Sequence, residues 1–467
     1  MTLTRREFLL QTGSCLGYAL GAAAFAAGIE RFSLINAFAQ GLDYRALVCV
    51  FLAGGNDGNN LVVPTDTTGY AAYAAARSAS GLAIARDALL PVTPSGGAGD
   101  FGLHPSLAAL QTLWNDGNLS IACNVGPLVQ PIDRQQYLNG APRPYQLFSH
   151  SDQIAQWQTA IADRVGQTGW GGRTADLFES HSSGFPMITA LSGGIFTRGQ
   201  TTTPLSVAPA PTALNQVLVL SGFGTAADEV ARKASMNFLR TLESEHALVA
   251  GADRTTQQAL DIGAILNSDV SLATAFPNTT LGNQLLQVAK MIKFNSMSPQ
   301  LGLNRQIFFC QLGGFDTHQG QVGSQSNLLT QVSQAIAAFY GATVEMGLEK
   351  QVTTFTLSDF GRTLQPAGSG QNVVGSDHAW GNHHFVVGGA VRGGDFYGVA
   401  GPNGSVFPDL QLGGPSDTDT RGRWIPTVSV EQYAATLASW YGVGEADLSI
   451  VFPNIGRFST NSLGFMN

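Results

Sequence analysis

Residues 46–58 read Ala-Leu-Val-Cys-Val-Phe-Leu-Ala-Gly-Gly-Asn-Asp-Gly, an unbroken apolar run that ends in glycines and polar residues. Such a run is typical of a strand buried on both faces, as in a parallel sheet covered by helices. Similar runs occupy residues 119–125, 306–312, 352–357 and 385–391. Helical patterns separate these runs, so the sequence predicts a doubly wound α/β domain with a largely parallel central sheet.

Two helical stretches complete the expected organisation of this domain. Residues 225–268 look wholly helical, which predicts a helical insertion or subdomain within residues 225–300 of a domain that spans 40–467. A final helix is predicted to open at Ser429, because Gln432 three residues later completes a capping box.

The first 39 residues have the three parts of an export signal. Arg5 and Arg6 form a twin-arginine pair, an Ala- and Gly-rich apolar stretch follows, and Ala37-Phe38-Ala39 supplies a small-x-small cleavage site. The alternative is a membrane anchor, but the many small residues and the cleavage site favour removal. We therefore expect recognition by the twin-arginine translocase, a periplasmic or secreted location, and no membrane span after cleavage.

The composition argues against nucleic acid as a partner. The chain has a net charge of −8, and only 12% of its residues are charged. Its four lysines form no cluster, so a polyanion would be repelled rather than gathered.

The cysteines of the mature chain are predicted to be structural. Cys49, Cys123 and Cys310 each lie inside an apolar strand-like run, as expected for small buried residues of a sheet. An odd number without close partners does not indicate a disulfide framework.

Acidic residues and histidines cluster in the sequence just after or before the predicted strands. In open α/β sheets ligands bind beyond the carboxyl ends of the strands, so these side chains are expected to share one edge. Carboxylates and imidazoles are the ligands that a divalent ion such as Zn²⁺ or Mn²⁺ accepts, with Mg²⁺ and Ca²⁺ as further possibilities. The alternative for each residue alone is a turn or a helix cap. The candidate ligands are Asp57, Asp316, His318, Asp359, Asp377, His378, His383 and His384.

A candidate nucleophile lies in the segment Phe148-Ser149-His150-Ser151, before a predicted helix. Ser149 or Ser151 at a helix N-terminus could act if a metal or the adjacent His150 activated it, although an ordinary N-cap serine has the same pattern. Arg362 could brace an anion through two parallel hydrogen bonds, or equally pair with a structural carboxylate.

The motifs together resemble a known family. Gly-Gly-Asn-Asp-Gly at 54–58, Phe-Asp-Thr-His at 315–318 and Ser-Asp-Phe-Gly-Arg-Thr at 358–363 are similar to domain of unknown function 1501, as are the twin arginines and Asp-His at 377–378. That family is grouped with the alkaline phosphatase and sulfatase superfamily. The resemblance implies a three-layer alkaline-phosphatase-like fold.

The same resemblance implies a set of metal ligands. It would place Asp57 on a second metal, Asp316 and His318 on a first metal, and Asp359 with His378, His383 or His384 in the remaining positions. Phe360 stands where the superfamily has a histidine, so one expected ligand is absent.

The function implied is metal-dependent hydrolysis of phosphate or sulfate esters, and the expected partner besides the translocase is a small ester substrate or an envelope polysaccharide. The alternative is a non-catalytic exported protein that binds an envelope partner on the same fold with a degenerate metal site. No cysteine starts the Cys-x-Pro-x-Arg motif of formylglycine sulfatases, and no Gly-x-Ser-x-Gly elbow occurs.

Overall fold

The computed structural model describes residues 44–178, 185–218, 222–241, 247–298, 301, 303–369 and 374–467. The predicted signal peptide at residues 1–39 lies outside these residues. Among the residues described, no helix is both long enough and apolar enough to span a bilayer.

A central sheet runs through the molecule in the order β13-β5-β12-β9-β1-β8-β6-β7, with β14 paired to β5. Four apolar runs of the sequence form its long strands, each within one residue of the predicted bounds at either end. The strands are β1 (Arg45–Leu52), β5 (Leu119–Gly126), β6 (Ile188–Ala190), β7 (Leu205–Ser206), β8 (Arg305–Leu312), β9 (Val352–Ser358), β12 (Asn382–Val387), β13 (Phe396–Tyr397) and β14 (Val428–Ser429).

The sheet is parallel except at one strand. β1 pairs in parallel with both β8 and β9 along its length, whereas β12 runs antiparallel to β5 and β9. The run at 385–391 therefore differs from the expected parallel strand in direction and in its bounds. The segment between β9 and β12 is filled by a small hairpin rather than a crossover helix, so the chain re-enters the sheet from the edge at which it left.

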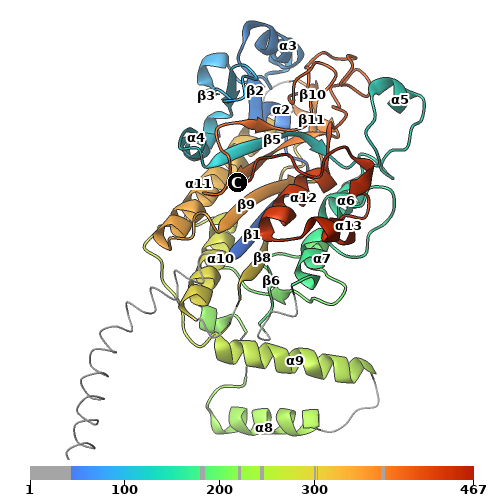
Figure 1. The fold of residues 1–467 in the computed structure, drawn as a ribbon. Coiled ribbons are helices and arrows are strands. Elements are labelled where there is room, and N and C mark those ends of the chain that lie inside the picture. Colours follow the sequence, from blue (N-terminus) through green and yellow to red (C-terminus); the bar gives the residue numbers. More distant parts are fainter. Residues whose placement is uncertain are drawn as a thin grey trace, which may run out of the picture.

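Helices cover both faces of the sheet, which makes three layers (Figure 1). Alternate side chains of β1 point to opposite faces: Val48 packs with one set of helices, and Cys49 packs with the other. The first set is α4 (Ala108–Asn115), α10 (Thr280–Met297) and α11 (Gln321–Glu345). The second set is α6 (His150–Thr159), α7 (Trp170–Asp176), α12 (Val430–Tyr441) and α13 (Leu448–Val451).

The structure bears out two local predictions about these layers. Cys49, Cys123 and Cys310 are free and buried in the sheet. Ser429 caps α12, because its hydroxyl accepts from the Gln432 N–H while the Gln432 side chain accepts from the Ser429 N–H.

Short elements lie beyond the carboxyl ends of the parallel strands. They comprise α2 (Gly58–Leu61), α3 (Thr67–Arg77), α5 (Arg134–Leu138), the hairpin β10 (Arg362–Ala367) and β11 (Gly375–His378), and the three-stranded sheet β2 (Val62–Pro64), β4 (Phe101–Leu103) and β3 (Leu90–Val92).

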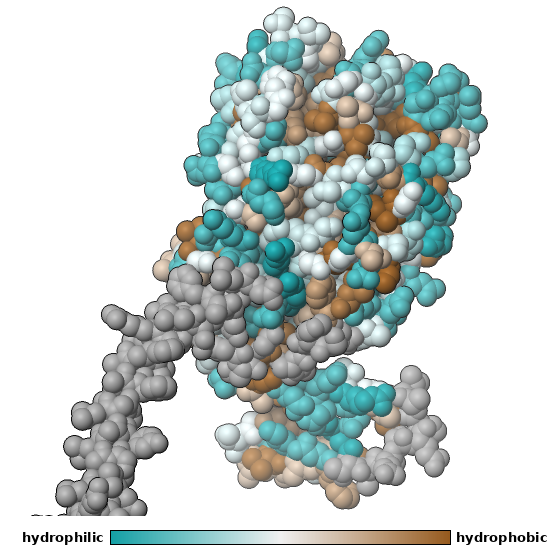
Figure 2. All heavy atoms as spheres, in the orientation of Figure 1, coloured by the Kyte–Doolittle hydropathy of each residue, from teal (hydrophilic) through white to brown (hydrophobic). Residues whose placement is uncertain are grey.

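The range 225–300, predicted as a helical insertion, holds three helices with different positions. α10 packs against β8 and belongs to the central layers. α8 (Ala227–Thr241) and α9 (Ala247–Ile265) form a pair outside those layers (Figure 1). Hydrophobic and hydrophilic side chains share the surface of this pair (Figure 2), and Phe238 on α8 is 65% exposed.

Candidate metal centre

Two glycines shape the turn that follows β1. Gly54 has φ +119°, and a Cβ there would collide with the backbone nitrogen of Asp316. A Cβ at Gly55 would collide with the ring of Phe360. These glycines therefore let the ends of β1, β8 and β9 approach one another closely.

The close approach brings Asp359, at the end of β9, against the first residue of α6. The Gly54 N–H donates to Asp359 Oδ1 at 2.9 Å, and His150 Nδ1 lies 2.7 Å from Asp359 Oδ2. Asp359 is buried. One of its oxygens holds the turn, and the other orients His150.

Three imidazoles converge on one carboxylate oxygen at this edge of the sheet. Asp316 Oδ1 lies 3.2 Å from His318 Nε2, 3.5 Å from His150 Nε2 and 3.8 Å from His378 Nε2. The ligand atoms of His150, Asp316 and His378 all fall within 4.8 Å of one another. His150 comes from α6, Asp316 and His318 follow β8, and His378 ends β11.

The other ring nitrogen of each histidine contacts a hydrogen-bond acceptor. His150 Nδ1 contacts Asp359, His318 Nδ1 lies 3.1 Å from Asp377 Oδ1, and His378 Nδ1 lies 2.8 Å from the Phe148 carbonyl. A carboxylate or carbonyl can only accept, so each Nδ1 carries the proton. In its neutral form, each imidazole then presents the Nε2 lone pair toward the middle of the cluster.

Imidazole lone pairs that face one another repel, so a proton or a metal ion between them stabilises this arrangement. His318 Nε2 lies 2.9 Å from His378 Nε2, and His150 Nε2 is buried without a hydrogen-bond partner among the described residues. Two ligands bound to one tetrahedral Zn²⁺ at about 2.0–2.1 Å sit about 3.3 Å apart, close to the separations seen here. Histidines that bind a metal usually donate their other ring N–H to a carboxylate or a carbonyl, as these three do, so the residues fit a bound divalent ion.

The charges around Asp316 keep it in the form that binds cations. Burial raises the pKa of this carboxyl, but the hydrogen bond and charge of Arg362, together with the charges of His150 and His318, outweigh burial and hold the pKa below its usual value. The hydrogen bond to Asp359 raises the pKa of His150. Burial lowers the pKa of His378, which favours its neutral, ligating form.

Arg362, predicted either to brace an anion or to pair with a structural carboxylate, is buried and pairs with a carboxylate. Its Nη2 donates to Asp316 Oδ1 at 2.6 Å and to the Gly54 carbonyl, while Nε and Nη1 donate to the carbonyls of Gly55 and Ser376. Its side chain has 0% exposure, so it positions Asp316 and does not face a substrate.

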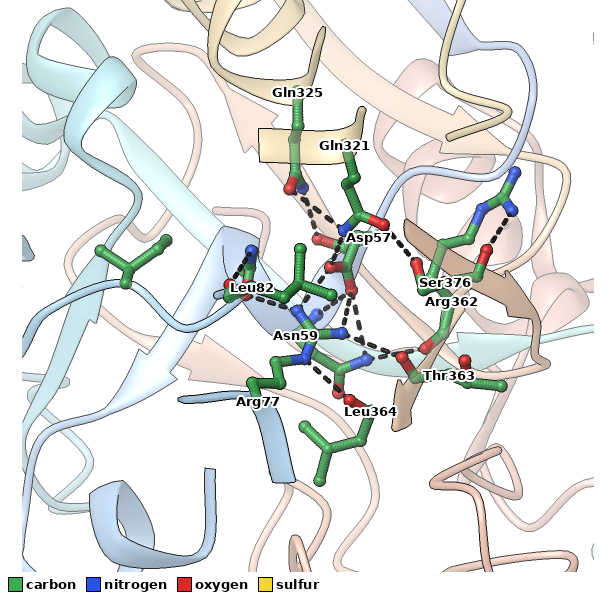
Figure 3. A network of polar contacts seen from close by, with 12 residues as sticks. Asp57, Asn59, Arg77, Leu82, Gln321, Gln325, Arg362, Thr363, Leu364 and Ser376 are labelled. Atoms are coloured by element: carbon green, nitrogen blue, oxygen red, sulfur yellow. Dashed lines mark hydrogen bonds and ion pairs between the residues drawn. The ribbon is translucent and has the colours of Figure 1, made fainter. Parts of the chain in front are cut away.

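Asp57, predicted as a ligand, lies in a separate network (Figure 3). Its carboxylate is paired with Arg77 at 2.6 Å, and both side chains have 0% exposure. It also accepts from the Asn59 N–H and from Gln321 Nε2. Asp57 therefore neutralises a buried guanidinium and is not among the residues that the structure groups as metal ligands.

His383 and His384, also predicted as ligands, lie inside β12. Both are buried, and burial lowers the pKa of each imidazole to about 3. His383 stacks on Phe407 and accepts from the Asn124 N–H, whereas His384 packs against Trp157. Their rings thus belong to the packing of the sheet and not to the cluster.

The two candidate nucleophiles lie at the start of α6. Ser149 is the N-cap residue, but its hydroxyl makes no cap and donates to Asp152 Oδ2 at 2.6 Å. The Ser151 hydroxyl lies 3.2 Å from that of Ser149 and 3.3 Å from Asp152 Oδ2. Both hydroxyls therefore lie one residue from His150 and share an acidic partner.

An aromatic ring lines the buried side of the cluster. The Phe360 ring centroid lies 4.5 Å from that of His378 and 4.7 Å from that of His150. Phe360 offers no ligand atom, so it closes this side of the site to a further ion.

The sequence did not reveal several residues that support the cluster. Arg421 donates to Asp377 Oδ2 at 2.7 Å and thereby fixes the partner of His318. The backbone carbonyl of Phe148, which holds His378, has no sequence signature. Arg77 offered a weak signal, since it is the sole charged residue of α3 in TTGYAAYAAAR.

The fold and the cluster together define a three-layer α/β protein with a histidine- and aspartate-lined centre at the carboxyl edge of its sheet. The chain belongs to the family described as "Protein of unknown function (DUF1501)", whose pattern it matches over residues 44–406. A search of curated proteins found no match to the sequence.

Three of the solved structures that match this chain, each at low identity, are the following. The periplasmic domain of EcEptC from Escherichia coli, in complex with Zn, shares 9% identity over 88% of this chain and 87% of its own, with a TM-score of 0.35. The lipoteichoic acid synthase LtaP from Listeria monocytogenes shares 8% identity over 82% of this chain and 74% of its own, with a TM-score of 0.27. The sulfatase PsFucS1 from Pseudoalteromonas sp. shares 10% identity over 78% of this chain and 66% of its own, with a TM-score of 0.30. At this level of likeness, no conclusion about the activity of this chain follows from them.

Proposed function

We propose that this protein is an exported, metal-dependent hydrolase of phosphate or sulfate esters. The observation that carries the proposal is the convergence of three imidazole Nε2 atoms on Asp316 Oδ1, with every Nδ1 bound to an acceptor. Three nitrogen ligands and one carboxylate favour a zinc-type transition metal over Mg²⁺ or Ca²⁺, which prefer sites made of oxygen atoms.

The ligands of the centre are His150, Asp316, His318 and His378, and each has a residue that positions it. When bound, a divalent ion supplies positive charge that stabilises negative charge developing on an ester and lowers the pKa of an oxygen nucleophile. Asp316 and His318 are 51% and 42% exposed, so an ester can reach the cluster from solvent.

Ser149 is the proposed nucleophile for the hydrolysis. Its hydroxyl already donates to Asp152, which can accept the proton as Ser149 Oγ attacks the phosphorus or sulfur atom. The ester oxygen then leaves with its electron pair and takes a proton from solvent, and water cleaves the covalent intermediate in a second step. Ser149→Ala is expected to remove turnover, whereas Ser151→Ala is expected to retain most of it.

The decisive test compares metal content and turnover in the mature protein. Asp316→Asn removes the negative charge of the central oxygen ligand and should lower both the bound metal, measured by elemental analysis, and the hydrolysis of nitrophenyl phosphate or nitrophenyl sulfate by about 100-fold. Asp447→Asn, at an exposed carboxylate far along the chain, is the matched control and should leave both unchanged. A wild-type protein that binds no divalent ion would contradict the proposal.

A second candidate function, binding without catalysis, is favoured by one observation. Phe360 stands against two of the imidazoles and provides no ligand for a further ion. Wild-type protein that holds the metal but turns over neither ester would support this function, with an envelope polysaccharide as its ligand.

Export through the twin-arginine route is the cellular part of the proposal. It rests on Arg5, Arg6 and the cleavage site at Ala37–Ala39. Replacing both arginines by lysine should leave the protein in the cytoplasm with its signal uncleaved, as read by fractionation and by N-terminal sequencing. Export of that variant at the wild-type level would refute this route.

A further inference from the structure

Arg77 ends α3 and reaches into the interior with all its donors used (Figure 3). Nη1 donates to Asp57 Oδ2 and to Asn60 Oδ1, and Nη2 donates to Asp57 Oδ1 at 3.1 Å and to the Thr363 carbonyl at 2.9 Å. Nε donates to the Leu364 carbonyl at 2.9 Å. A guanidinium keeps its charge at all ordinary pH values, so it is a permanent cation at this position.

The Asp57 carboxylate is equally saturated. Oδ1 accepts from Arg77 and from both the N–H and the side chain of Asn59. Oδ2 accepts from Arg77 and from Gln321 Nε2. With five donors on two oxygens, this carboxylate has no lone pair left for a divalent ion.

The hydrogen-bond network around Asp57 and Arg77 also binds the β10–β11 hairpin, which carries part of the metal centre. Arg77 holds the carbonyls of residues 363 and 364 in β10, and Asn59 Nδ2 donates to the Arg362 carbonyl at 2.7 Å. Gln321 Oε1 accepts from the Ser376 hydroxyl in β11. Arg362 pairs in register with His378 across the hairpin, so the network reaches one ligand directly.

The hairpin also delivers two groups that hold the other ligands. The Arg362 side chain holds Asp316, and Asp377 orients His318. The Asp377 N–H donates to the Thr363 hydroxyl, which ties the two strands together at this point. Displacing β10 would therefore move three of the four ligands or their supports at once.

We propose that Arg77 replaces a second divalent ion at Asp57, and that the buried Arg77–Asp57 pair positions the β10–β11 hairpin so that the centre binds a single ion. This inference rests on the proposed function, because it describes the centre of that hydrolase. Asp57 and Arg77 are positioning residues, and they touch neither the ion nor the ester.

The physical reason for the arrangement is that a buried carboxylate needs a compensating charge. A bound ion would hold its ligands only while it is present, whereas a guanidinium covalently attached to α3 is there as soon as the chain folds. A buried ion pair with every donor and acceptor satisfied is also directional, so it fixes the hairpin in one place.

The test measures zinc stoichiometry and affinity by calorimetry on the mature protein after chelation. Wild type should bind one Zn²⁺ per chain. Gln321→Met keeps the side-chain length but cuts the contacts with Asp57 and Ser376, and should still bind one ion with an affinity lowered about 10- to 100-fold. Gln287→Met on α10, another buried glutamine, is the matched control and should bind as wild type does.

Asp57→Asn distinguishes the possible failures. A wild type that binds two ions while Asp57→Asn binds one would overturn this inference and leave the hydrolase standing. Wild-type affinity in Gln321→Met would overturn the positioning role. A wild type that binds no ion would overturn the proposed function and this inference with it.

Discussion

Glu431 is a buried acidic residue whose pKa is far above its ordinary value. It lies in the first turn of α12 with 0% exposure, and neither carboxylate oxygen makes a hydrogen bond of normal geometry to the described residues. Burial raises its pKa to about 8, with Asp163 adding to this effect and Arg457 opposing it. Arg173 is a further charged neighbour. The carboxyl is therefore neutral at pH 7.

The raised pKa of Glu431 predicts a loss of stability as the pH rises. The folded protein holds the proton up to about pH 8, whereas the unfolded chain releases it near pH 4.5. The stabilising contribution is full below about pH 4.5 and is lost as the pH rises through 8, with a size of order a few kcal/mol. Urea midpoints measured from pH 5 to 9 should fall in wild type more than in Glu431→Gln.

Glu445→Gln is the matched control for this effect because Glu445 is exposed. It should follow the wild-type pH dependence closely. If Glu431→Gln instead parallels wild type across the whole range, Glu431 is not the group that titrates.

At the residue scale, the sequence predicts where several site residues lie but not which partners they have. Asp316, His318 and His378 follow or end strands at one edge, and that placement is readable from the strand pattern. Asp57 lies at the same edge but is not grouped with them, because it pairs with Arg77 at the end of α3, 20 residues further along the chain. Spacing reveals which groups share an edge, but it does not reveal which charge already satisfies them.

At the element scale, prediction succeeded where burial is uniform. β1, β5, β8 and β9 are buried on both faces, so each appears in the sequence as a run rich in apolar and β-branched residues. β12 opens with Asn382, His383 and His384, which resemble a loop in sequence but are buried in the strand. The hairpin β10–β11 was not predicted either. Its polar sequence also resembles a loop, and tertiary contacts stabilise it.

The capping box of α12 allows a prediction at this scale. Ser429→Ala removes the hydroxyl that accepts from the Gln432 N–H at 3.0 Å and should cost about 1 kcal/mol, read as a lower urea midpoint. Ser439→Ala, at an exposed position inside the same helix, is the control and should be neutral or slightly stabilising. Equal midpoints for the two variants would show that the cap does not contribute.

At the scale of the whole molecule, the centre joins segments that are far apart in the chain. His150 starts α6, Asp316 and His318 follow β8, and His378 ends β11 on the hairpin. These segments meet only in the folded protein, so an ion that binds them together stabilises the folded state over the unfolded chain. The stability of the entire domain should therefore depend on the metal.

Metal addition and removal should shift the thermal transition of the mature protein. Free Zn²⁺ at about 100 times its dissociation constant is expected to add about 2.7 kcal/mol to the free energy of unfolding, and a chelator should reverse the shift. Asp316→Asn is the internal control, because it lacks the charge of the central ligand and its unfolding temperature should respond to Zn²⁺ much less than that of wild type. Zinc acts on the folded state. If neither zinc nor a chelator changes the transition temperature of wild type, the imidazoles meet without an ion between them. The lone pair of His150 Nε2 would then need a proton or a water as its partner.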